Sequence, residues 1–195
     1  MPLVFVKEIK RKFIHLSSSI IPIFAFFFDR ELTLIALLLT TSIFIAFDYL
    51  RIKKNKFIIE WHNRFFNDIT RKKESKSFTG ASYVFLSCLT VIFFFELKIA
   101  CTSLFIMSIS DSFSAIIGKK YGSVKIYKEK TFEGSLAFFF SSLIIILLVP
   151  GLNLFHAMIA ILFTTFVELY SVDVVDDNLS IPISFSASML ILGAF

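Results

Sequence analysis

Apolar stretches and short polar segments alternate along almost the entire chain. A helix needs about 20 mainly apolar residues, with a range of about 17–25, to cross the hydrocarbon core of a bilayer. Seven stretches approach this length, and the shorter ones would need tilt, local thinning of the bilayer or extension into their flanks. They cover residues 13–28, 32–50, 81–95, 99–117, 136–149, 154–170 and 181–195. The pattern predicts an all-α polytopic membrane protein with about seven transmembrane helices, in which residues 1–195 form a single integral membrane domain.

Composition and charge add a topology to this picture. The 195 residues are 56% hydrophobic and include 27 Phe, which is more apolar than a soluble core of this length requires. All but two of the 20 Lys and Arg residues fall in residues 7–12, 51–76 and 119–130. Cytoplasmic loops carry such an excess, so we expect a cytoplasmic N-terminus and external turns at residues 29–31, 96–98 and 150–153. Because the basic residues flank membrane spans, the expected partner is the bilayer and not a nucleic acid.

The longest polar segment, residues 51–79, contains an apolar pattern of its own. Phe57, Ile58, Trp61, Phe65 and Ile69 recur at helical spacing. This spacing predicts an amphipathic helix that lies in the membrane interface with its Trp at headgroup depth. A helix packed on the protein would show the same spacing.

Two acidic residues, Asp111 and Glu168, lie well inside apolar stretches. An ionisable group within a membrane span is costly unless it is paired or hydrated, so its default interpretation is functional. Small residues, among them Ser108 and Gly118, share the helical face of Asp111 and would let a helix or a ligand approach closely. The alternative is that Asp111 is the buried partner of a Lys or Arg.

A basic segment that contains glycines follows Asp111. Its candidates for anion contact are Gly118, Lys119, Gly122, Lys128, Lys130, Gly134 and Ser135. Gly134 and Ser135 come at the start of the fifth predicted span, where backbone N–H groups favour an anion. Lysines suit phosphate as point charges, and Mg²⁺ is commonly held by one or two carboxylates plus phosphate. The segment therefore suggests phosphate with a divalent cation, although membrane topology alone would also explain its lysines.

The N-terminal segment carries further candidates. Glu8, Lys12 and His15 fall on one helical face at i, i+4 and i+7, with Arg11 beside them. His15 is either a base or a hydrogen-bonded structural histidine.

Two other candidate groups lie at the ends of predicted spans on the same side. Thr79 can cap the third predicted span, and Tyr83 can point toward the same cytoplasmic cleft. Residues 173–178 form an acidic segment that ends in Asp177 and Asn178. It opposes the basic trend, which suggests a metal site or pairing with the basic loops, or else a solvated turn.

Five ordered motifs carry a family resemblance. They are Glu8-x-x-Arg11-Lys12-x-x-His15, Thr79-Gly80-x-x-Tyr83, Asp111-x-x-Ser114-Ala115-x-x-Gly118-x-x-x-Gly122, Lys130-Thr-Phe-Glu133-Gly134-Ser135, and Glu168 with Asp177-Asn178 and Pro182. This set, which covers nearly the whole chain, resembles the CTP-dependent membrane lipid kinases: dolichol kinase, phytol kinase and the CTP-dependent diacylglycerol kinase. The superfamily also includes phosphatidate cytidylyltransferase. Ser110 replaces a usual Gly, and Thr131 replaces a Ser. The resemblance is to the compact catalytic core, as in phytol kinase, and we expect no counterpart of the long N-terminal extension of dolichol kinases.

The resemblance implies phosphorylation of a membrane lipid alcohol by CTP at the cytoplasmic face of a multi-pass protein, expected in a prokaryotic inner membrane. Polyprenol or dolichol, a phytol-type prenol and diacylglycerol are all possible acceptors. The implied magnesium ligands are Asp111, Glu168 and Asp177. The implied catalytic residues are Asp111, Arg11, Lys12, Lys130, Glu133 and His15, and Glu133 or His15 would orient the lipid hydroxyl. The implied nucleotide and phosphate contacts are Thr79, Tyr83, Gly118, Lys119, Gly122, Lys128, Gly134, Ser135 and Asn178.

Two other functions fit parts of the pattern. A cytidylyltransferase would make pyrophosphate and a CDP-lipid, whereas a kinase makes CDP and a phosphorylated lipid. A transporter or scaffold could use Asp111 and Glu168 as an ion path, but it would distribute polar groups across the membrane, and this chain gathers them on one side. A P-loop ending in Gly-Lys-Ser/Thr is absent, so the expectation of CTP rests on the resemblance. The sequence predicts neither the acceptor nor the oligomeric state.

Overall fold

The computed structural model describes residues 3–66, 70, 74, 77–170 and 176–193. In chain order the elements are α1 (Leu3–Ser17), α2 (Ile20–Phe27), α3 (Arg30–Ile52), α4 (Lys56–Phe66), α5 (Gly80–Phe94), α6 (Leu97–Phe105), a π-helical turn (Ile106–Ser110), α7 (Asp111–Tyr121), β1 (Lys125–Tyr127), β2 (Lys130–Thr131), α8 (Phe132–Leu148), α9 (Leu154–Tyr170) and α10 (Asp177–Ile191). The predicted all-α class is confirmed. The exception is a small antiparallel hairpin, β1–β2, where the sequence indicated only a loop.

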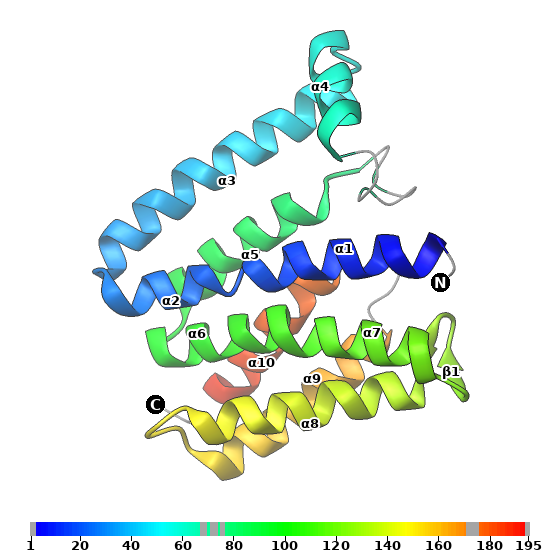
Figure 1. The fold of residues 1–195 in the computed structure, drawn as a ribbon. Coiled ribbons are helices and arrows are strands. Elements are labelled where there is room, and N and C mark those ends of the chain that lie inside the picture. Colours follow the sequence, from blue (N-terminus) through cyan, green and yellow to red (C-terminus); the bar gives the residue numbers. More distant parts are fainter. Residues whose placement is uncertain (1–2, 67–69, 71–73, 75–76, 171–175, 194–195) are drawn as a thin grey trace.

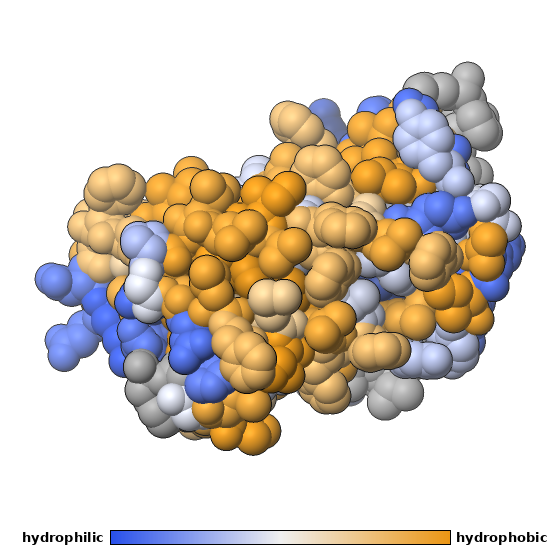
Figure 2. All heavy atoms as spheres, turned by 90° about the horizontal axis from the view of Figure 1, so that it is seen from below, coloured by the Kyte–Doolittle hydropathy of each residue, from blue (hydrophilic) through white to orange (hydrophobic). Residues whose placement is uncertain are grey.

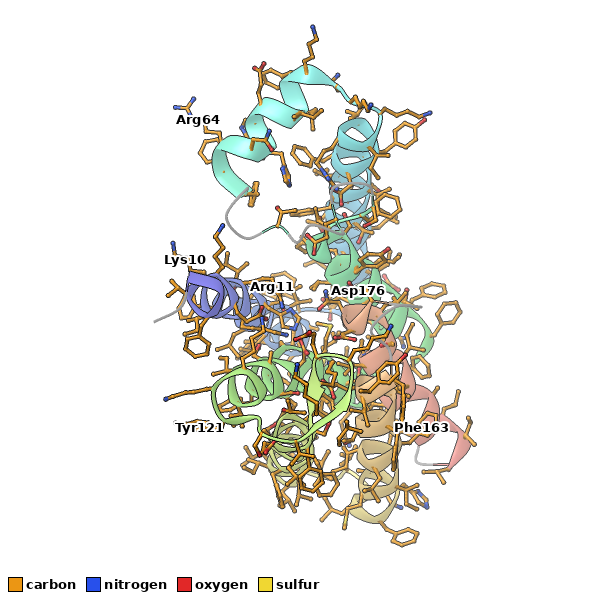
Figure 3. All side chains as sticks on the ribbon, turned by 90° about the vertical axis from the view of Figure 1, so that its right-hand side faces the viewer. Lys10, Arg11, Arg64, Tyr121, Phe163 and Asp176 are labelled. Carbon is orange, nitrogen blue, oxygen red and sulfur yellow. The ribbon has the colours of Figure 1, made fainter. Side chains whose placement is uncertain are left out.

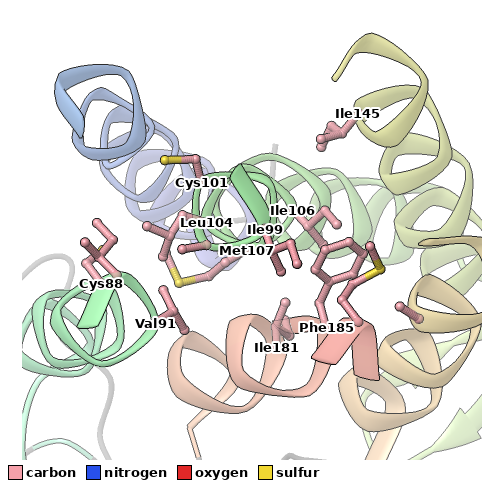
Figure 4. Close-up of a cluster of buried hydrophobic side chains, with 14 of the residues drawn as sticks. Cys88, Val91, Ile99, Cys101, Leu104, Ile106, Met107, Ile145, Ile181 and Phe185 are labelled. Carbon is pink, nitrogen blue, oxygen red and sulfur yellow. The ribbon is translucent and has the colours of Figure 1, made fainter. Parts of the chain in front are cut away.

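A continuous helical rod, formed by α6, the π-helical turn and α7, runs through the middle of the molecule (Figure 1). The rod packs against α1, α2, α8 and α10, while α3 packs mainly on α5. Buried apolar side chains from α5, the rod, α8 and α10 meet in one core (Figure 4). Its labelled members are Cys88, Val91, Ile99, Cys101, Leu104, Ile106, Met107, Ile145, Ile181 and Phe185. Tight packing around the rod fixes the position of Asp111, the first residue of α7.

The surface of the molecule is largely apolar. Figure 2 shows apolar side chains across the middle of one face and hydrophilic ones gathered toward its two ends. Large side chains such as Phe13, Ile43, Phe140 and Phe163 are more than half exposed on four different helices. Contiguous apolar surface of this extent is unusual for a soluble monomer. The surface therefore supports association with a membrane.

Two helical segments of the described residues are long and apolar enough to cross a bilayer by themselves. They are Arg30–Ile52 and Leu97–Tyr121, of which the first is mostly exposed and the second mostly buried. The helices Gly80–Phe94, Phe132–Leu148 and Leu154–Tyr170 are apolar but shorter. The count of seven transmembrane helices stays a prediction.

The predicted sidedness of the loops matches the arrangement of the helices. The three turns expected outside, which join α2 to α3, α5 to α6 and α8 to α9, lie at one end of the molecule (Figure 1). The N-terminus, the β1–β2 hairpin and the start of α10 lie toward the other end. Which end faces the cytoplasm stays a prediction.

The first predicted span is interrupted in the structure. Residues 13–28 include the end of α1, a turn and the whole of α2. Ser17 and Ser18 donate their hydroxyls to the carbonyls of Ile14 and His15, both at 2.6 Å. Pro22 has no backbone N–H, so it cannot donate the helical hydrogen bond to the carbonyl of Ser18, four residues earlier. Serine back-bonding and this proline together explain the break.

The amphipathic pattern of residues 51–79 forms α4, and Ile69 of that pattern lies outside the described residues. The ring of Trp61 packs on Phe47 of α3 with a centroid distance of 5.4 Å, and its side chain remains partly exposed. His62 points inward and is buried. Helix α4 therefore packs on the protein through one face.

Candidate active site

The centre of the site is an ion pair between α1 and α7. Lys12 Nζ donates a hydrogen bond to Asp111 Oδ2, and the two side chains are only 4% and 5% exposed. A buried charge without a partner is strongly destabilising, so each residue depends on the other. Asp111 is thus the buried partner of a lysine, which is the alternative to a purely functional role that the sequence left open.

A π-helical turn directly precedes Asp111 and faces the break between α1 and α2. His15 Nε2 lies 3.0 Å from Met107 O, and Ser19 Oγ lies 2.7 Å from Ser108 Oγ. Since a carbonyl oxygen only accepts hydrogen bonds, His15 must carry a hydrogen on Nε2. The same nitrogen lies 3.4 Å from Asp111 Oδ2. π-Helical turns are frequent at functional sites, and this one positions both the acid and the histidine.

The predicted polar face of α1 is confirmed, and its third member is Glu8. Arg11 and Lys119 both donate hydrogen bonds to the Glu8 carboxylate, which is buried. Burial alone would raise the pKa of Glu8, but Arg11 and Lys119 together hold it below its ordinary value. Lys119, expected as a phosphate contact, thus joins α7 to α1 in this structure.

A second ionic cluster joins the hairpin to α9 and α10. Lys130 donates hydrogen bonds to Glu168 and, at 3.2 Å, to Asp177 Oδ2. Burial opposes the charged form of this lysine, but Glu168 and Asp177 raise its pKa well above the ordinary value. Ser114 Oγ, on α7, donates to Glu168 Oε1 at 3.1 Å.

These two clusters form one continuous site. Asp111 and Ser114 lie in the first turn of α7, and each leads to one cluster. Figure 3 looks at this end of the molecule, with Arg11 and Asp176 near the middle of the view and Lys10 toward its margin. The fold thus gathers polar groups from α1, α7, the hairpin, α9 and α10.

The glycines of the basic segment serve close packing between α7 and α8. A Cβ atom on Gly118 would lie 2.9 Å from Thr131 Oγ1, and one on Gly134 would lie 3.0 Å from Ser114 O. A Cβ on Gly122 would lie 2.6 Å from Thr131 Cγ2. Protein atoms therefore fill the space that was expected to admit phosphate. Contact of these glycines with a nucleotide stays a prediction.

Thr131 caps α8 by accepting a hydrogen bond from Gly134 N at 3.2 Å. This cap uses an N–H group that was expected to face an anion. The hydroxyl of Ser135 is buried and has no hydrogen-bond partner among the described residues. One N–H group at the start of α8 is consequently engaged by Thr131, and the Ser135 hydroxyl has no such partner in the described part of the chain.

Glu133 lies apart from the buried acids. Its carboxylate accepts hydrogen bonds from the hydroxyl of Ser123, from Ser123 N at 2.9 Å and from Val124 N at 3.3 Å. The bonds from Ser123 and Val124 lower the pKa of Glu133 to about 2. The contacts fix the start of the hairpin, which differs from the expected role in orienting a lipid hydroxyl. Lys128, in the hairpin turn, has a positive φ of 50° and is exposed.

A cavity of about 490 Å³ opens beside the ion pair, between α1–α2 and α3–α5. Most of its wall is apolar, and its size is typical of a site for a small ligand. Its apolar lining includes Ile14, Ile20, Ile21, Phe44, Phe47, Phe66, Val84 and Phe85. Its polar lining includes Arg11, Lys12, His15, Thr79 and Asn178. The site thus places basic groups next to a largely apolar space.

The structure separates Thr79 from Tyr83. Thr79 lines the cavity, but Tyr83 is not among the lining residues and packs edge-on against Phe78. Thr79 occupies the cap position of α5, yet its hydroxyl forms no cap and donates instead to Asp48 Oδ2 at 2.9 Å. Asn178 Nδ2 donates to Gly80 O at 3.4 Å. A role of Tyr83 at the cleft stays a prediction.

Asp48 is a buried acid that is absent from the candidates predicted from the sequence. It lies at the end of the second predicted span and pairs with Arg51, three residues later. In the sequence, Asp48 could have been identified from its spacing to Arg51, because opposite charges three residues apart at the end of an apolar stretch can pair on a helix.

A metal ion would need the acids of these clusters. The described residues contain no group of three or more His, Cys, Asp and Glu side chains arranged to hold one. Asp111 and Glu168 each contact a lysine instead, and Asp177 shares Lys130 with Glu168. Carboxylate oxygens are nevertheless the donors that Mg²⁺ prefers, and Mg²⁺ needs only one or two of them when phosphate supplies the rest. These side chains fit that requirement.

Comparison with known proteins gives both a full-length relative and partial ones. The chain is 35% identical to the uncharacterized protein RP860 of Rickettsia prowazekii over 94% of each chain. It is 32% identical to a probable chloroplastic phytol kinase of Triticum aestivum over 63% of this chain and 46% of that protein. It is 36% identical to CTP-dependent diacylglycerol kinase 1 of Saccharomyces cerevisiae over 36% of this chain and 25% of that protein.

The matched region spans less than half the length of either kinase. No family model matches the chain, and no solved structure matches it. The chain therefore belongs to the family of RP860, and phytol kinase and CTP-dependent diacylglycerol kinase are its partial homologues.

Proposed function

We propose that this protein transfers the γ-phosphoryl group of CTP to a membrane lipid alcohol. The observation that carries the proposal is the position of the cavity. Its apolar wall suits a lipid chain, and its polar part contains Arg11, Lys12 and His15 next to buried Asp111. The homology to two kinds of lipid kinase supports a nucleotide donor and a lipid acceptor.

The acceptor that we favour is a long-chain prenol. The similarity to phytol kinase covers 63% of the chain, whereas the similarity to diacylglycerol kinase covers 36%. Phenylalanine and isoleucine side chains line the cavity, and most of its wall is apolar. A single hydrocarbon chain with one terminal hydroxyl fits such a lining.

Charge stabilisation would come from the two ionic clusters. Phosphoryl transfer depends mostly on positioning and on neutralising the charge of the phosphates. Arg11, Lys12 and Lys130 would bind the triphosphate, and Asp111 with Glu168 or Asp177 would hold Mg²⁺. When bound, Mg²⁺ would neutralise phosphate charge. The present ion pairs keep these side chains close together before the substrates bind.

His15 is the candidate base. Its Nε2 hydrogen points to Met107 O, so a neutral ring has its lone pair on Nδ1. In the proposed reaction the lipid hydroxyl oxygen forms a bond to the γ-phosphorus, and the bond to the bridging oxygen breaks. CDP leaves, and the hydroxyl proton passes to His15 Nδ1. His15 lines the cavity, and Glu133 is held away at the hairpin, which favours His15 over Glu133.

We also propose that the protein is a multi-pass protein of a prokaryotic inner membrane with this site at the cytoplasmic face. The positions of the basic segments support this orientation. Cysteines placed at Lys54 and Lys125 should resist labelling by an impermeant reagent added to intact cells. Labelling of either one from outside would contradict the orientation.

Incubation of the purified protein with CTP or ATP and separate acceptors tests the function. Phytol, a polyprenol and diacylglycerol should be compared in the same detergent micelles. We expect phosphorylated phytol or polyprenol to accumulate with CTP. Absence of a phosphorylated lipid with every donor and acceptor would contradict the proposal.

A further inference from the structure

We infer that Asp48 and Arg51 are positioning residues that hold the wall of the acceptor cavity. This inference rests on the proposed function, because it assigns the cavity to the lipid alcohol. Neither residue lines the cavity, and both are buried. They would therefore act through the residues that they hold.

Asp48 is saturated with hydrogen bonds. Its Oδ2 atom accepts from Thr79 N at 2.7 Å, from Thr79 Oγ1 at 2.9 Å and from Ser82 Oγ at 2.6 Å. Its Oδ1 atom accepts from Arg51 Nε at 3.0 Å and from Arg51 Nη2 at 2.9 Å. One carboxylate at the end of α3 thus holds the first turn of α5. Hydrogen bonds to an ionised acceptor are stronger than neutral ones.

Arg51 also forms hydrogen bonds with Glu74 and Ser77, which precede α5 in the chain. Arg51 Nη1 donates to Glu74 O at 2.8 Å, and Nη2 donates to Ser77 O at 2.6 Å. A planar guanidinium with its donors in a fixed geometry can serve one carboxylate and two carbonyls together. Lysine, with a single nitrogen, could not reproduce all of these bonds.

The held residues include part of the cavity wall. Glu74, Thr79 and Gly80 all line the cavity, and Gly80 O accepts the hydrogen bond from Asn178. Asn178 follows Asp177, which contacts Lys130. The Asp48–Arg51 pair therefore fixes the wall that lies between the acceptor cavity and the second ionic cluster.

Loss of the pair should move this wall more than the catalytic centre. Lys12 and His15 of α1 are held by hydrogen bonds to Asp111 and Met107 of the rod. We expect Asp48→Asn and Arg51→Gln to raise the KM for phytol roughly tenfold or more, since small displacements in a binding site have large effects. The KM for CTP should change less than the KM for phytol. Arg51→Lys, which keeps the charge, should give an intermediate KM for phytol.

Arg30 offers a matched control at the other end of the same helix pair. Its guanidinium joins α3 to α5 by donating to Ile92 O, Phe93 O and Phe95 O at 3.0, 2.9 and 3.2 Å. Arg30→Gln removes a comparable set of bonds far from the cavity. It should lower the melting temperature without raising the KM for phytol selectively.

Two measurements decide the inference. The first compares the KM for phytol, the KM for CTP and kcat in the four variants in micelles. A KM for phytol that is unchanged, or that rises equally in Arg30→Gln, would overturn the positioning role. The second measures hydrogen exchange of the backbone amides of residues 79–82 without substrate. Exchange should be faster in Asp48→Asn and Arg51→Gln than in Arg30→Gln.

The exchange measurement separates failure of this inference from failure of the proposed function. If the wild-type protein does not phosphorylate phytol, the proposed acceptor is wrong, and exchange alone decides whether the pair holds the wall. Unchanged exchange in Asp48→Asn and Arg51→Gln would overturn the inference even in an active enzyme. If Asp48→Asn does not fold, Arg51→Lys provides both readouts.

Discussion

Lys12 and Asp111 lie 99 residues apart in the chain and form a buried ion pair at the edge of the cavity. The pair joins α1 to the first residue of α7, where the π-helical turn ends. Lys12 lines the cavity, so the pair also marks where an apolar space meets charged groups. The stability of this part of the fold and the proposed chemistry therefore depend on the same two side chains.

Removal of one partner should be worse for stability than removal of both. We expect Lys12→Met to reduce the free energy of unfolding by about 3–5 kcal/mol, because it leaves the Asp111 carboxylate buried without its lysine. The double variant Lys12→Met/Asp111→Asn should recover part of this loss. Unfolding in a mild detergent, followed by circular dichroism, measures the difference. A double variant as unstable as the sum of the single variants would show that the residues are not coupled.

Asp111→Asn should abolish Mg²⁺-dependent transfer. The substitution leaves Lys12 buried without its carboxylate and should lower stability, but the protein should still insert and fold. Asparagine keeps the size of the side chain but lacks the charge that a metal ion requires. Asp29→Asn, at the cap position of α3 and on the opposite end of the molecule, is the control. Turnover measured across a magnesium titration decides the matter. Near wild-type activity of Asp111→Asn would make this acid purely structural.

His15→Gln should lower kcat by about 10²–10⁴-fold, the usual contribution of a general base. The KM for CTP should change little, because the proposal gives His15 no contact with the nucleotide. His156→Gln is the matched control, since His156 follows the turn between α8 and α9 at the other end. Equal kcat values for the two variants would remove His15 from the catalytic role.

Glu133→Gln should leave kcat within a few fold of wild type but loosen the hairpin. Hydrogen bonds from Ser123 and Val124 lower the pKa of Glu133 from 4.5 to about 2. A depressed pKa of a carboxyl group means that its stabilising effect is present above the unfolded value and is lost as pH falls. The wild-type hairpin should therefore loosen between about pH 4.5 and pH 2, and the variant should not show this transition. Hydrogen exchange at residues 123–124 follows it, and a large loss of kcat would restore a catalytic role for Glu133.

Local spacing was sufficient to predict one face of the site. Glu8, Lys12 and His15 follow helical periodicity, and α1 brings all three against the rod. Asp111 was identified because an acid within an apolar stretch needs a partner. Both predictions were possible because each needs only local information: the spacing of residues along one helix, or the cost of burying one charge.

Other parts of the site depend on tertiary contacts that no local pattern contains. Asp48 accepts hydrogen bonds from Thr79, which lies 31 residues away. The π-helical turn has no marker among residues 106–110, and the hairpin turn uses a lysine, Lys128, in a left-handed conformation that usually favours glycine or asparagine. The sequence favours phosphate contact for the glycines next to Thr131, because no local pattern indicates that α7 packs closely on α8 there.

The most direct test of the central claim follows the phosphorus atoms of CTP. Purified protein is incubated with phytol, Mg²⁺ and CTP labelled either at the γ-phosphate or at the α-phosphate, with and without excess unlabelled ATP. The proposed function predicts that the γ-label appears in phosphorylated phytol and the α-label in CDP. Excess ATP should compete less well than excess unlabelled CTP, and equal competition would remove the preference for CTP but not the kinase activity. No label in any lipid would contradict the account. So would an α-label in a CDP-lipid together with release of pyrophosphate, in a parallel incubation with phosphatidate in place of phytol.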